Sequence, residues 1–459
     1  MNTDLINLIK KYDHPGPRYT SYPPAPVFSP EFGPQAFREA VTEVERTPSH
    51  ADLSLYLHIP FCDTLCYFCG CTTIITQNTE HLNRYLGYLY REIDLLAGVV
   101  NDQRRVLQLH LGGGTPTYLA PSQITELGNY LHKSFAVRGD AELSVEVDPR
   151  DITHAHLKAL RDVRFNRISL GVQDFDLNVQ RAVNRNQSEL VTRQVIDWSR
   201  ELGFSSLNID LIYGLPLQTV DSFTRTLEKV IDISPERIAV YNFAYVPWIK
   251  KQQKLIHGED LPSAETKLQI LSKTIDMLTR AGYIYIGMDH FARPDDELTV
   301  AQKTKTLHRN FQGYSTRAGS DLYGLGMSAI SHFGTYYAQN VKTLQEYYHA
   351  LEQGDFATHV GYKMTFDDEI RKFVIMRLMC DLTLSKRTVE EKYSITFDDY
   401  FRESMIKLTP LLDDRLIISE DEALAVTPEG RLFLRNIALC FDAHASTSPR
   451  PTPVYSRTV

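Results

Sequence analysis

Short apolar segments alternate along much of the chain with longer segments in which apolar residues recur every three or four positions. The short segments lie at residues 54–59, 106–111, 143–147, 167–172, 207–215 and 237–243, with a further one at 283–288. The longer ones carry helical stripes, one of which is Leu82, Tyr85, Leu86, Leu89, Ile93 and Leu96. Dense apolar strands are typical of a parallel sheet covered on both faces. The pattern predicts an α/β fold of βα units, as a full barrel, a partial barrel or a doubly wound sheet, and six or seven strands favour the partial barrel.

The regions on either side of this repeat have a different pattern. Residues 1–50 are rich in Pro and aromatic side chains, which predicts an extended N-terminal arm. The βα region is expected to span 51–345. Beyond it we expect a small, mostly helical domain at 360–445, with a helix at 367–380, a hairpin at 416–426 and a helix from Thr427, and then a flexible tail at 446–459.

Composition and charge exclude several classes of protein. The 459 residues include 49 Lys and Arg against 57 Asp and Glu, a formal net charge of −8. An acidic chain is a poor match for a polyanion, so we expect no nucleic-acid partner. No apolar run approaches the roughly 18 residues of a membrane span, and the N-terminus lacks the pattern of a signal peptide. We therefore expect a cytoplasmic protein, with a monomer as the default.

Four of the six cysteines lie within ten residues. Cys62, Cys66 and Cys69 have the spacing C-x3-C-x2-C, and Cys71 follows, in the loop after the first predicted strand. Thiolates select soft metals and iron–sulfur clusters. A structural zinc site or a set of buried cysteines are the alternatives, but no second pair of ligands follows and the density within one loop is high. Three cysteines would hold a [4Fe–4S] cluster with one iron left open.

This cysteine motif after the first strand of a βα series resembles the radical S-adenosylmethionine (SAM) superfamily. In that superfamily the open iron binds the amino and carboxylate groups of SAM, and the reduced cluster cleaves SAM to a radical that abstracts hydrogen. Further stretches resemble the oxygen-independent coproporphyrinogen III oxidase family: PRYTSYP (17–23), CYFCGC (66–71), LGGGTPTYL (111–119), VEVDPR (145–150), LGVQDFD (170–176), NIDLIYGLP (208–216), GMDHFARPDDEL (287–298), LHRNFQGY (307–314) and TPEGRLFLRNI (427–437). The resemblance implies a three-quarter barrel of the radical SAM type.

The resemblance also implies which residues bind SAM. These are Tyr56, Phe68, Gly113, Gly114, Thr115, Glu146, Gln173, Arg185, Asp210, Ala244 and Ile330. Polar residues such as Glu146 and Asp210 in otherwise apolar strands independently favour a shared site, although each alone is also compatible with a satisfied buried group. Tyr56 and Glu146 are expected to matter most after the cluster ligands, by positioning. Whether one SAM molecule or two bind is left open, and His58 is expected as a structural partner rather than an iron ligand.

The implied reaction converts two propionates of coproporphyrinogen III to vinyl groups, giving protoporphyrinogen IX, with a reduced flavodoxin or ferredoxin as electron donor. Cationic side chains would bind the propionates, and aromatic side chains would contact the macrocycle. The candidates are Arg18, Tyr19, Tyr22, residues 308–311 and Arg317. The arm would serve as a lid. A haem-binding chaperone of the same fold and a radical SAM enzyme with another substrate are the alternatives. The final electron acceptor and the role of Cys71 are left open.

Overall fold

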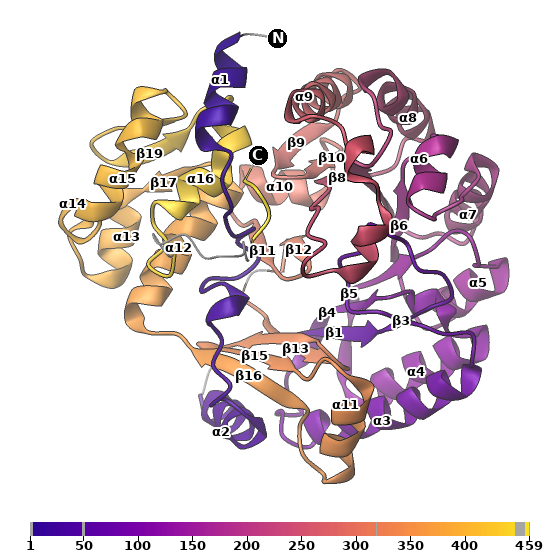
Figure 1. The fold of residues 1–459 in the computed structure, drawn as a ribbon. Coiled ribbons are helices and arrows are strands. Elements are labelled where there is room, and N and C mark those ends of the chain that lie inside the picture. The colour runs from indigo at the N-terminus through magenta and orange to yellow at the C-terminus, as the bar shows by residue number, and fades with distance from the viewer. Residues whose placement is uncertain (1–2, 48–50, 318, 446–454, 459) are drawn as a thin grey trace.

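The computed structural model describes residues 3–47, 51–317, 319–445 and 455–458. Its centre is one curved sheet with the strand order β16-β15-β14-β13-β1-β4-β5-β6-β7-β8-β10-β9 (Figure 1). The parallel strands are β13 (Asp321–Leu325), β1 (Leu53–Ile59), β4 (Arg105–Gly113), β5 (Ala136–Val147), β6 (Arg167–Gln173), β7 (Ser206–Tyr213) and β8 (Arg237–Asn242). Six of these seven are the strands expected from the sequence, so the α/β partial barrel is confirmed.

Antiparallel strands extend the sheet at both ends and leave it open. On one side are β10 (His290–Ala292) and β9 (Ile284–Gly287). On the other are β14 (Ile330–Phe333), β15 (Tyr336–Asn340) and β16 (Thr358–Lys363). The sheet therefore continues past residue 345, where the barrel region was expected to end, and the chain leaves it at β16.

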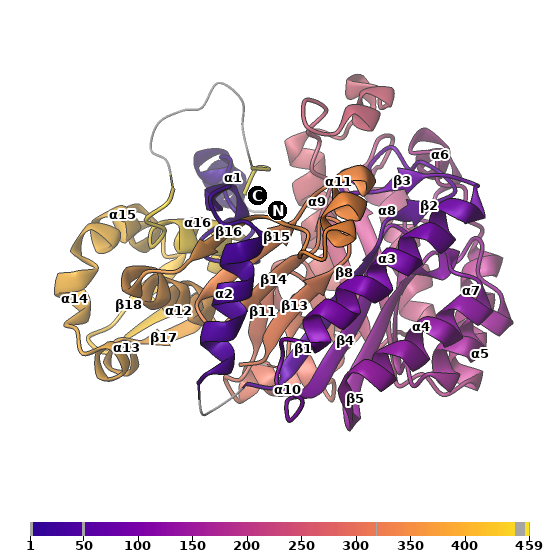
Figure 2. The ribbon, with the colours of Figure 1, turned by 90° about the horizontal axis from the view of Figure 1, so that it is seen from below.

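Helices surround the sheet on its outer side (Figures 1 and 2). They are α3 (Thr79–Ala97), α4 (Pro121–Ser134), α5 (His154–Asp162), α6 (Leu177–Ala182), α7 (Glu189–Glu201), α8 (Val220–Ile233), α9 (Ala264–Arg280) and α11 (Leu344–Glu352). A further helix, α10 (Glu297–Lys303), lies at the amino-terminal end of the barrel (Figure 2). The predicted stripe from Leu82 to Leu96 is the buried face of α3, whose first turn is capped by the Asn78 side chain. Apolar side chains of helices and strands form one continuous core.

The C-terminal region forms a second, separate core. It contains α12 (Phe366–Asp381), α13 (Lys386–Tyr393), α14 (Phe397–Tyr400), α15 (Arg402–Asp413) and α16 (Leu434–Leu439), with a small sheet of β17 (Thr383–Ser385), β18 (Ile417–Ser419) and β19 (Ala423–Val426). The helix expected from Thr427 is shorter than predicted. The Thr427 hydroxyl accepts from the Gly430 N–H in a turn, a 3-10 segment follows, and the α-helix begins only at Leu434.

The N-terminal arm is less extended than its composition suggests. It contains α1 (Thr3–Tyr12) and α2 (Pro34–Glu45), and α2 buries Phe37, Ala40 and Val41 against the sheet region. Between the helices the chain is largely irregular and lies along the C-terminal domain, where Arg435 donates to the carbonyls of Gly16 and Pro17. Most of the tail predicted to be flexible lies outside the described residues, but Arg457 pairs with Pro15.

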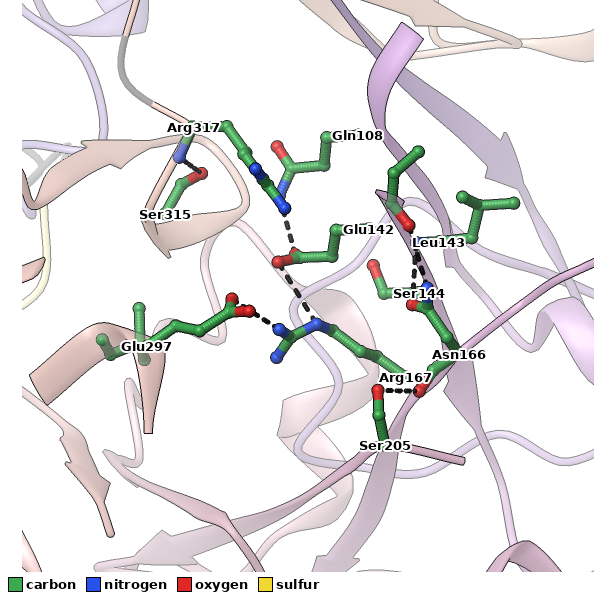
Figure 3. A network of polar contacts seen from close by, with 12 residues as sticks. Gln108, Glu142, Leu143, Ser144, Asn166, Arg167, Ser205, Glu297, Ser315 and Arg317 are labelled. Atoms are coloured by element: carbon green, nitrogen blue, oxygen red, sulfur yellow. Dashed lines mark hydrogen bonds and ion pairs between the residues drawn. The ribbon is translucent and has the colours of Figure 1, made fainter. Parts of the chain in front are cut away.

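Ion pairs occupy the interior of the barrel near the amino-terminal ends of the strands (Figure 3). Arg167 Nε lies 3.3 Å from Glu142 Oε2, and Arg167 Nη2 lies 2.6 Å from Glu297 Oε2. Gln108 Nε2 donates to the other oxygen of Glu142 at 2.9 Å. Burial raises the pKa of Glu142, but Arg167 and Arg237 outweigh it and hold that pKa below its ordinary value. Gln108, Glu142 and Arg167 line a cavity of about 150 Å³, whereas larger cavities lie at the carboxyl ends.

Among the described residues, none of the helices is both long and apolar enough to cross a bilayer.

Two glycines offer a matched test of the packing. A Cβ on Gly430 would collide with the carbonyl of Leu416, which is backbone and cannot move aside, so Gly430→Ala is expected to lower the free energy of unfolding by about 3 kcal/mol. Gly87 lies exposed within α3 with open space at its Cβ, so Gly87→Ala is expected to raise it by roughly 0.5–1 kcal/mol. Denaturant unfolding measures both changes, and equal effects of the two substitutions would contradict the packing described here.

Candidate active site at the cysteine loop

A cavity of about 620 Å³ opens at the carboxyl ends of the parallel strands. Its wall includes the cysteine loop, residues 62–71, and the ends of β4 to β8. Chemistry in α/β sheets is sited at this edge. Of the residues predicted from the sequence, those that line it are Cys62, Cys66, Phe68, Cys69, Gly113, Gly114, Thr115, Glu146, Gln173, Arg185, Asp210 and Ala244.

The two remaining predicted residues, Tyr56 and Ile330, line an adjacent cavity of about 510 Å³. Gly113 and Glu146 belong to both cavities, so the two spaces meet at the end of β4 and β5. The structure therefore gathers every predicted cluster and SAM residue around one connected site.

Cationic side chains surround the thiols. Arg185 Nη1 lies 3.6 Å and Arg150 Nη2 3.7 Å from Cys66 Sγ, and both guanidinium groups pair with Asp148, at 2.9 and 2.6 Å. Burial raises the pKa of Asp148, but the two arginines outweigh it and keep that pKa below its ordinary value. The arginines supply positive charge where a set of thiolates would concentrate negative charge.

The other thiols have local hydrogen-bond donors. Thr115 Oγ1 donates to Cys62 Sγ at 3.3 Å, although burial still raises the pKa of Cys62 to about 12. The exposed Cys71 donates to Cys69, and this bond, together with the charges of Lys250 and Arg185, lowers the pKa of the Cys69 thiol to about 6. A lowered pKa favours the thiolate, which is the form that binds metal.

The donor set fits an iron–sulfur cluster. Within the part of the chain that the structure describes, no three His, Cys, Asp or Glu side chains converge as a single metal ion requires. The thiols of Cys62, Cys66 and Cys69 instead line the wall of the larger cavity. Arg185 Nε, buried and without a hydrogen-bond partner, adds an unsatisfied donor beside them. Soft thiolates around a space with cations at its edge match a cluster carried on three cysteines.

The Gly-rich stretch allows β4 to pack directly against the cysteine loop. Gly113 has a φ of +116°, and a Cβ there would lie 2.7 Å from the His58 ring. Gly114 donates to the Ile59 carbonyl at 2.8 Å, and Thr115 donates to that of Phe61 at 2.8 Å. The glycines thus bring the backbone close to the loop as well as to the cavity.

Tyr56 and His58 form a fixed pair beside the glycines. His58 Nε2 lies 2.9 Å from the Thr72 carbonyl oxygen, which can only accept, so Nε2 carries the proton. Nδ1 then accepts from the Tyr56 hydroxyl at 3.1 Å. Burial lowers the pKa of His58, which favours this neutral form. Both ring nitrogens have protein partners, as expected of a structural histidine.

Glu146 and Asp210 reach the cavity from neighbouring regions of the barrel. Glu146 Oε2 accepts from the Gly113 N–H at 3.0 Å. Burial raises the pKa of Glu146, but the hydrogen bond and charge of His110 outweigh it and lower the pKa overall. Burial dominates at Asp210 and raises its pKa to about 6, although Ser169 and Asn208 donate to its oxygens at 2.8 Å. Both carboxylates can accept hydrogen bonds from a bound hydroxyl or amine at neutral pH.

Gln173 belongs to β6, the strand between those that carry Glu146 and Asp210, and Arg185 is hydrogen-bonded to the same strand. Gln173 ends β6 with a φ of +68°, a left-handed conformation that turns the chain at the rim of the cavity. Arg185 Nη2 donates to the Gly171 carbonyl at 2.6 Å, and a Cβ on Gly171 would approach that guanidinium to 3.1 Å. Gly171 therefore leaves room for Arg185 at the thiols.

The predicted propionate-binding residues divide into three groups. Arg18 lines the larger cavity and pairs with Asp289 at 3.1 Å, so the arm does contribute to the site. Tyr19 and Tyr22 do not line it. Their hydroxyls bond to Asp442 and to the Ala443 N–H, which shows that these rings anchor the arm to the C-terminal domain.

Residues 308–317 lie near the smaller cavity or within the barrel. Phe311 lines the smaller cavity. Arg309 is 6% exposed, and its Nε and Nη1 have no hydrogen-bond partner, although its guanidinium lies 4.8 Å from the centre of the Tyr314 ring. His308 is largely enclosed, with its Nδ1 unpartnered, and Arg317 Nη2 reaches the Asp140 carbonyl. Arg309 lines neither cavity, but it is a buried cation with unused donors.

Sequence reasoning missed several residues of the site. Asp148 and Arg150 belong to the motif VEVDPR but had no predicted role, and neither had Tyr241 or His110, yet all four line the cavities. Asp148 lies two positions after Glu146, a spacing that shares one face of an extended chain, so the signal was present. Lys250 and Gln253 also line the larger cavity, and nothing in their sequence context indicated it.

Comparison with known proteins gives full-length matches. The radical SAM superfamily model matches residues 56–230, and the HemN C-terminal domain model matches residues 364–433. Proteins named oxygen-independent coproporphyrinogen III oxidase are 49% identical in Escherichia coli, over 97% of this chain and 96% of the relative, and 47% identical in Synechocystis, over 98% and 97%. The solved structure described as coproporphyrinogen III oxidase (HemN) from Escherichia coli, a radical SAM enzyme, matches with a TM-score of 0.91 and 48% identity, over 96% of this chain and 99% of that one.

These matches span the arm, the barrel and the C-terminal domain, and their identity is well above the level at which a shared fold alone would be inferred. The chain belongs to the family of oxygen-independent coproporphyrinogen III oxidases, within the radical SAM superfamily.

Proposed function

We propose that the protein catalyses the oxygen-independent oxidative decarboxylation of two propionate side chains of coproporphyrinogen III to vinyl groups, giving protoporphyrinogen IX. The observation that carries the proposal is the convergence of three thiols and the polar ends of four strands on one connected site. Relatives named for this activity match the chain over nearly its whole length. Haem binding without decarboxylation, as in a chaperone of this fold, is the alternative. Release of CO2 from coproporphyrinogen III distinguishes the two functions.

Cys62, Cys66 and Cys69 would hold a [4Fe–4S] cluster, and the cavity beside them would hold SAM. When bound, these groups supply the one-electron chemistry that removes a hydrogen atom from a substrate propionate. Arg150 and Arg185 would offset the negative charge of the thiolates. A cavity of this size is in the range typical of cofactor sites.

The strand ends would orient SAM. Gly113, Gly114 and Thr115 would approach its amino and carboxylate groups, and Glu146 and Asp210 would accept hydrogen bonds from its amine or ribose. Phe68 and Ala244 would contribute apolar contacts to the same cavity, and Gln173 and Arg185 polar ones. Tyr56 and Ile330 line the adjacent cavity, which would take either part of the substrate or a second SAM molecule.

The arm and the 308–317 region would recognise the substrate. Arg18 reaches the cavity from the arm, and Arg309 has two unsatisfied N–H groups that suit a carboxylate. An arm fixed over the mouth would exclude water and oxygen from the reaction. A reduced flavodoxin or ferredoxin would supply the electron, and we retain a monomeric, cytoplasmic protein as part of the proposal.

Removing one thiol tests the cluster assignment. After anaerobic reconstitution with iron and sulfide, Cys66→Ala is expected to lose most of its bound iron, because two thiolates hold a cubane poorly. Cys440→Ala removes a buried thiol of the C-terminal core and serves as the control. Iron and sulfide content and loss of two CO2 per coproporphyrinogen III are measured for both. Full iron content in Cys66→Ala, or haem binding by the wild type without decarboxylation, would contradict the proposal.

Arg309 tests substrate recognition. Arg309→Gln is expected to raise the KM for coproporphyrinogen III about tenfold, because a charged hydrogen bond contributes roughly 1.5–3 kcal/mol, whereas Arg309→Lys should restore part of the loss. Arg161→Gln, which removes a guanidinium of α5 that packs on Phe204, is the control. Steady-state kinetics with the SAM affinity measured in parallel distinguish the outcomes. An unchanged KM in Arg309→Gln would exclude this residue from propionate binding.

A further inference from the structure

One surface segment lies directly against the cysteine loop, and only its inner side chains, among them Lys250 and Gln253, line the larger cavity. Residues 246–257, here called the lysine segment, follow β8 and include a 3-10 helix at Lys251–Leu255. The segment projects from the molecule on the side where β2 (Phe61–Cys62) and β3 (Ile74–Ile75) lie (Figure 2). It is the part of the surface that a molecule approaching the thiols from this side would meet.

The lysine segment is hydrogen-bonded to the backbone that carries the thiols. Lys250 Nζ donates to the Cys71 carbonyl at 3.1 Å, and Gln252 Nε2 donates to that of Cys69 at 2.6 Å. Gln253 Nε2 reaches the Phe68 carbonyl at 3.3 Å. The segment and the cysteine loop are thus joined at three successive points, so a partner docked on the segment would lie close to the cluster site.

The same segment exposes large apolar side chains. Trp248 is 49% exposed and Leu255 54%, and neither lines a cavity, whereas the exposed Ile249 lines the larger cavity and is not counted here. Isolated exposed apolar residues are common on protein surfaces, but Trp248 and Leu255 lie in the sequence on either side of the lysines of the segment. Tryptophan in particular is enriched among the residues that dominate binding at protein interfaces.

The charge of the segment is opposite to that of the whole chain. Lys250, Lys251 and Lys254 lie within it, and no Asp or Glu occurs from residue 237 to residue 258. The chain as a whole has a net charge of −8. A local positive charge with apolar side chains fits an acidic protein partner, because complementary charge speeds encounter and apolar anchors retain the complex.

The proposed function requires such a partner, and the inference rests on that function. Each propionate that is decarboxylated loses a hydrogen atom and then one further electron, while one electron must enter the cluster from outside to cleave SAM. Because electron transfer weakens steeply with distance, the carrier must dock near the thiols. We propose that the lysine segment is the docking surface for a small acidic one-electron carrier protein of the flavodoxin or ferredoxin type.

Charge reversal tests the proposal. Lys251→Glu/Lys254→Glu changes two exposed lysines that line neither cavity, and Lys133→Glu/Lys303→Glu makes the same change in charge on α4 and α10. For the reconstituted holoenzymes, we expect the first pair to weaken binding of a purified flavodoxin at low salt about tenfold. It should slow cluster reduction by photoreduced flavodoxin to a similar extent, whereas the control pair should resemble the wild type. Turnover with dithionite should be unchanged in both.

A second variant removes the apolar contribution. Trp248→Ala/Leu255→Ala is expected to weaken flavodoxin binding about tenfold with little change in salt dependence. Circular dichroism and iron content verify that each variant is folded and loaded. If flavodoxin binding and cluster reduction change by less than twofold in both variants, the proposal is overturned.

Three further outcomes of these experiments support or overturn the proposed docking surface or the proposed function. Loss of binding to vesicles of anionic phosphatidylglycerol, with flavodoxin binding intact, would assign the surface to a membrane instead and overturn the proposal. Failure of the wild type to turn over coproporphyrinogen III with dithionite would refute the proposed function. Because dithionite replaces the carrier protein, this result is independent of the docking surface. Flavodoxin-specific loss in both variants, with dithionite turnover preserved, is the result that supports the docking surface.

Discussion

Charge compensation at the thiols is the interaction on which the rest of the site depends. Cys66 comes from the loop after β1, Asp148 follows β5, and Arg185 follows α6, yet the ion pairs bring them together. Thiolates clustered in a cavity repel one another and are costly to desolvate, so the cations that offset them have to be fixed. Asp148 fixes both arginines, and Gly171 leaves room for one of them. Strands far apart in the sequence are thereby tied to a single loop.

The barrel also explains why the opposite end of its interior has a different character. At the amino-terminal end, Arg167 is held between Glu142 and Glu297, and the charges satisfy one another (Figure 3). At the carboxyl end, Arg185 Nε has no hydrogen-bond partner, and Arg185 and Asp210 both line the larger cavity. The same period-two pattern of inward-facing polar residues thus forms ion pairs at one end and lines the larger cavity at the other.

The parts predicted well from the sequence are those with a strong local signal. The dense apolar runs identified β1 and β4 to β8, because strands buried on both faces leave little doubt about their type. The strands β13 to β16 were missed, since they are tyrosine-rich, short and mostly antiparallel, and their pairing depends on contacts far apart in the chain. In the arm, prolines suggested an extended chain, but Pro34 stands at the first turn of α2, where proline is well tolerated.

The site residues show the same difference between strong and weak local sequence signals. Glu146 and Asp210 could be predicted because a carboxylate within an apolar strand is costly to bury unless it has a partner or a ligand. Asp148 and Arg150 lie just beyond the strand, where charged residues are common. Tyr19 and Tyr22 were placed at the substrate because aromatic residues suit a macrocycle, but aromatic residues also anchor one segment to another, and here they do so. Which of these roles an aromatic residue takes depends on tertiary contacts that the local sequence does not encode.

The central claim is that three protein thiolates carry a cubane whose fourth iron is open to SAM. Mössbauer spectroscopy of anaerobically reconstituted protein labelled with ⁵⁷Fe tests it most directly. The account predicts that one iron site of four differs from the rest and that its parameters shift when SAM is added, while the other three are unchanged. Four equivalent iron sites that do not respond to SAM, or no cubane at all, would contradict it.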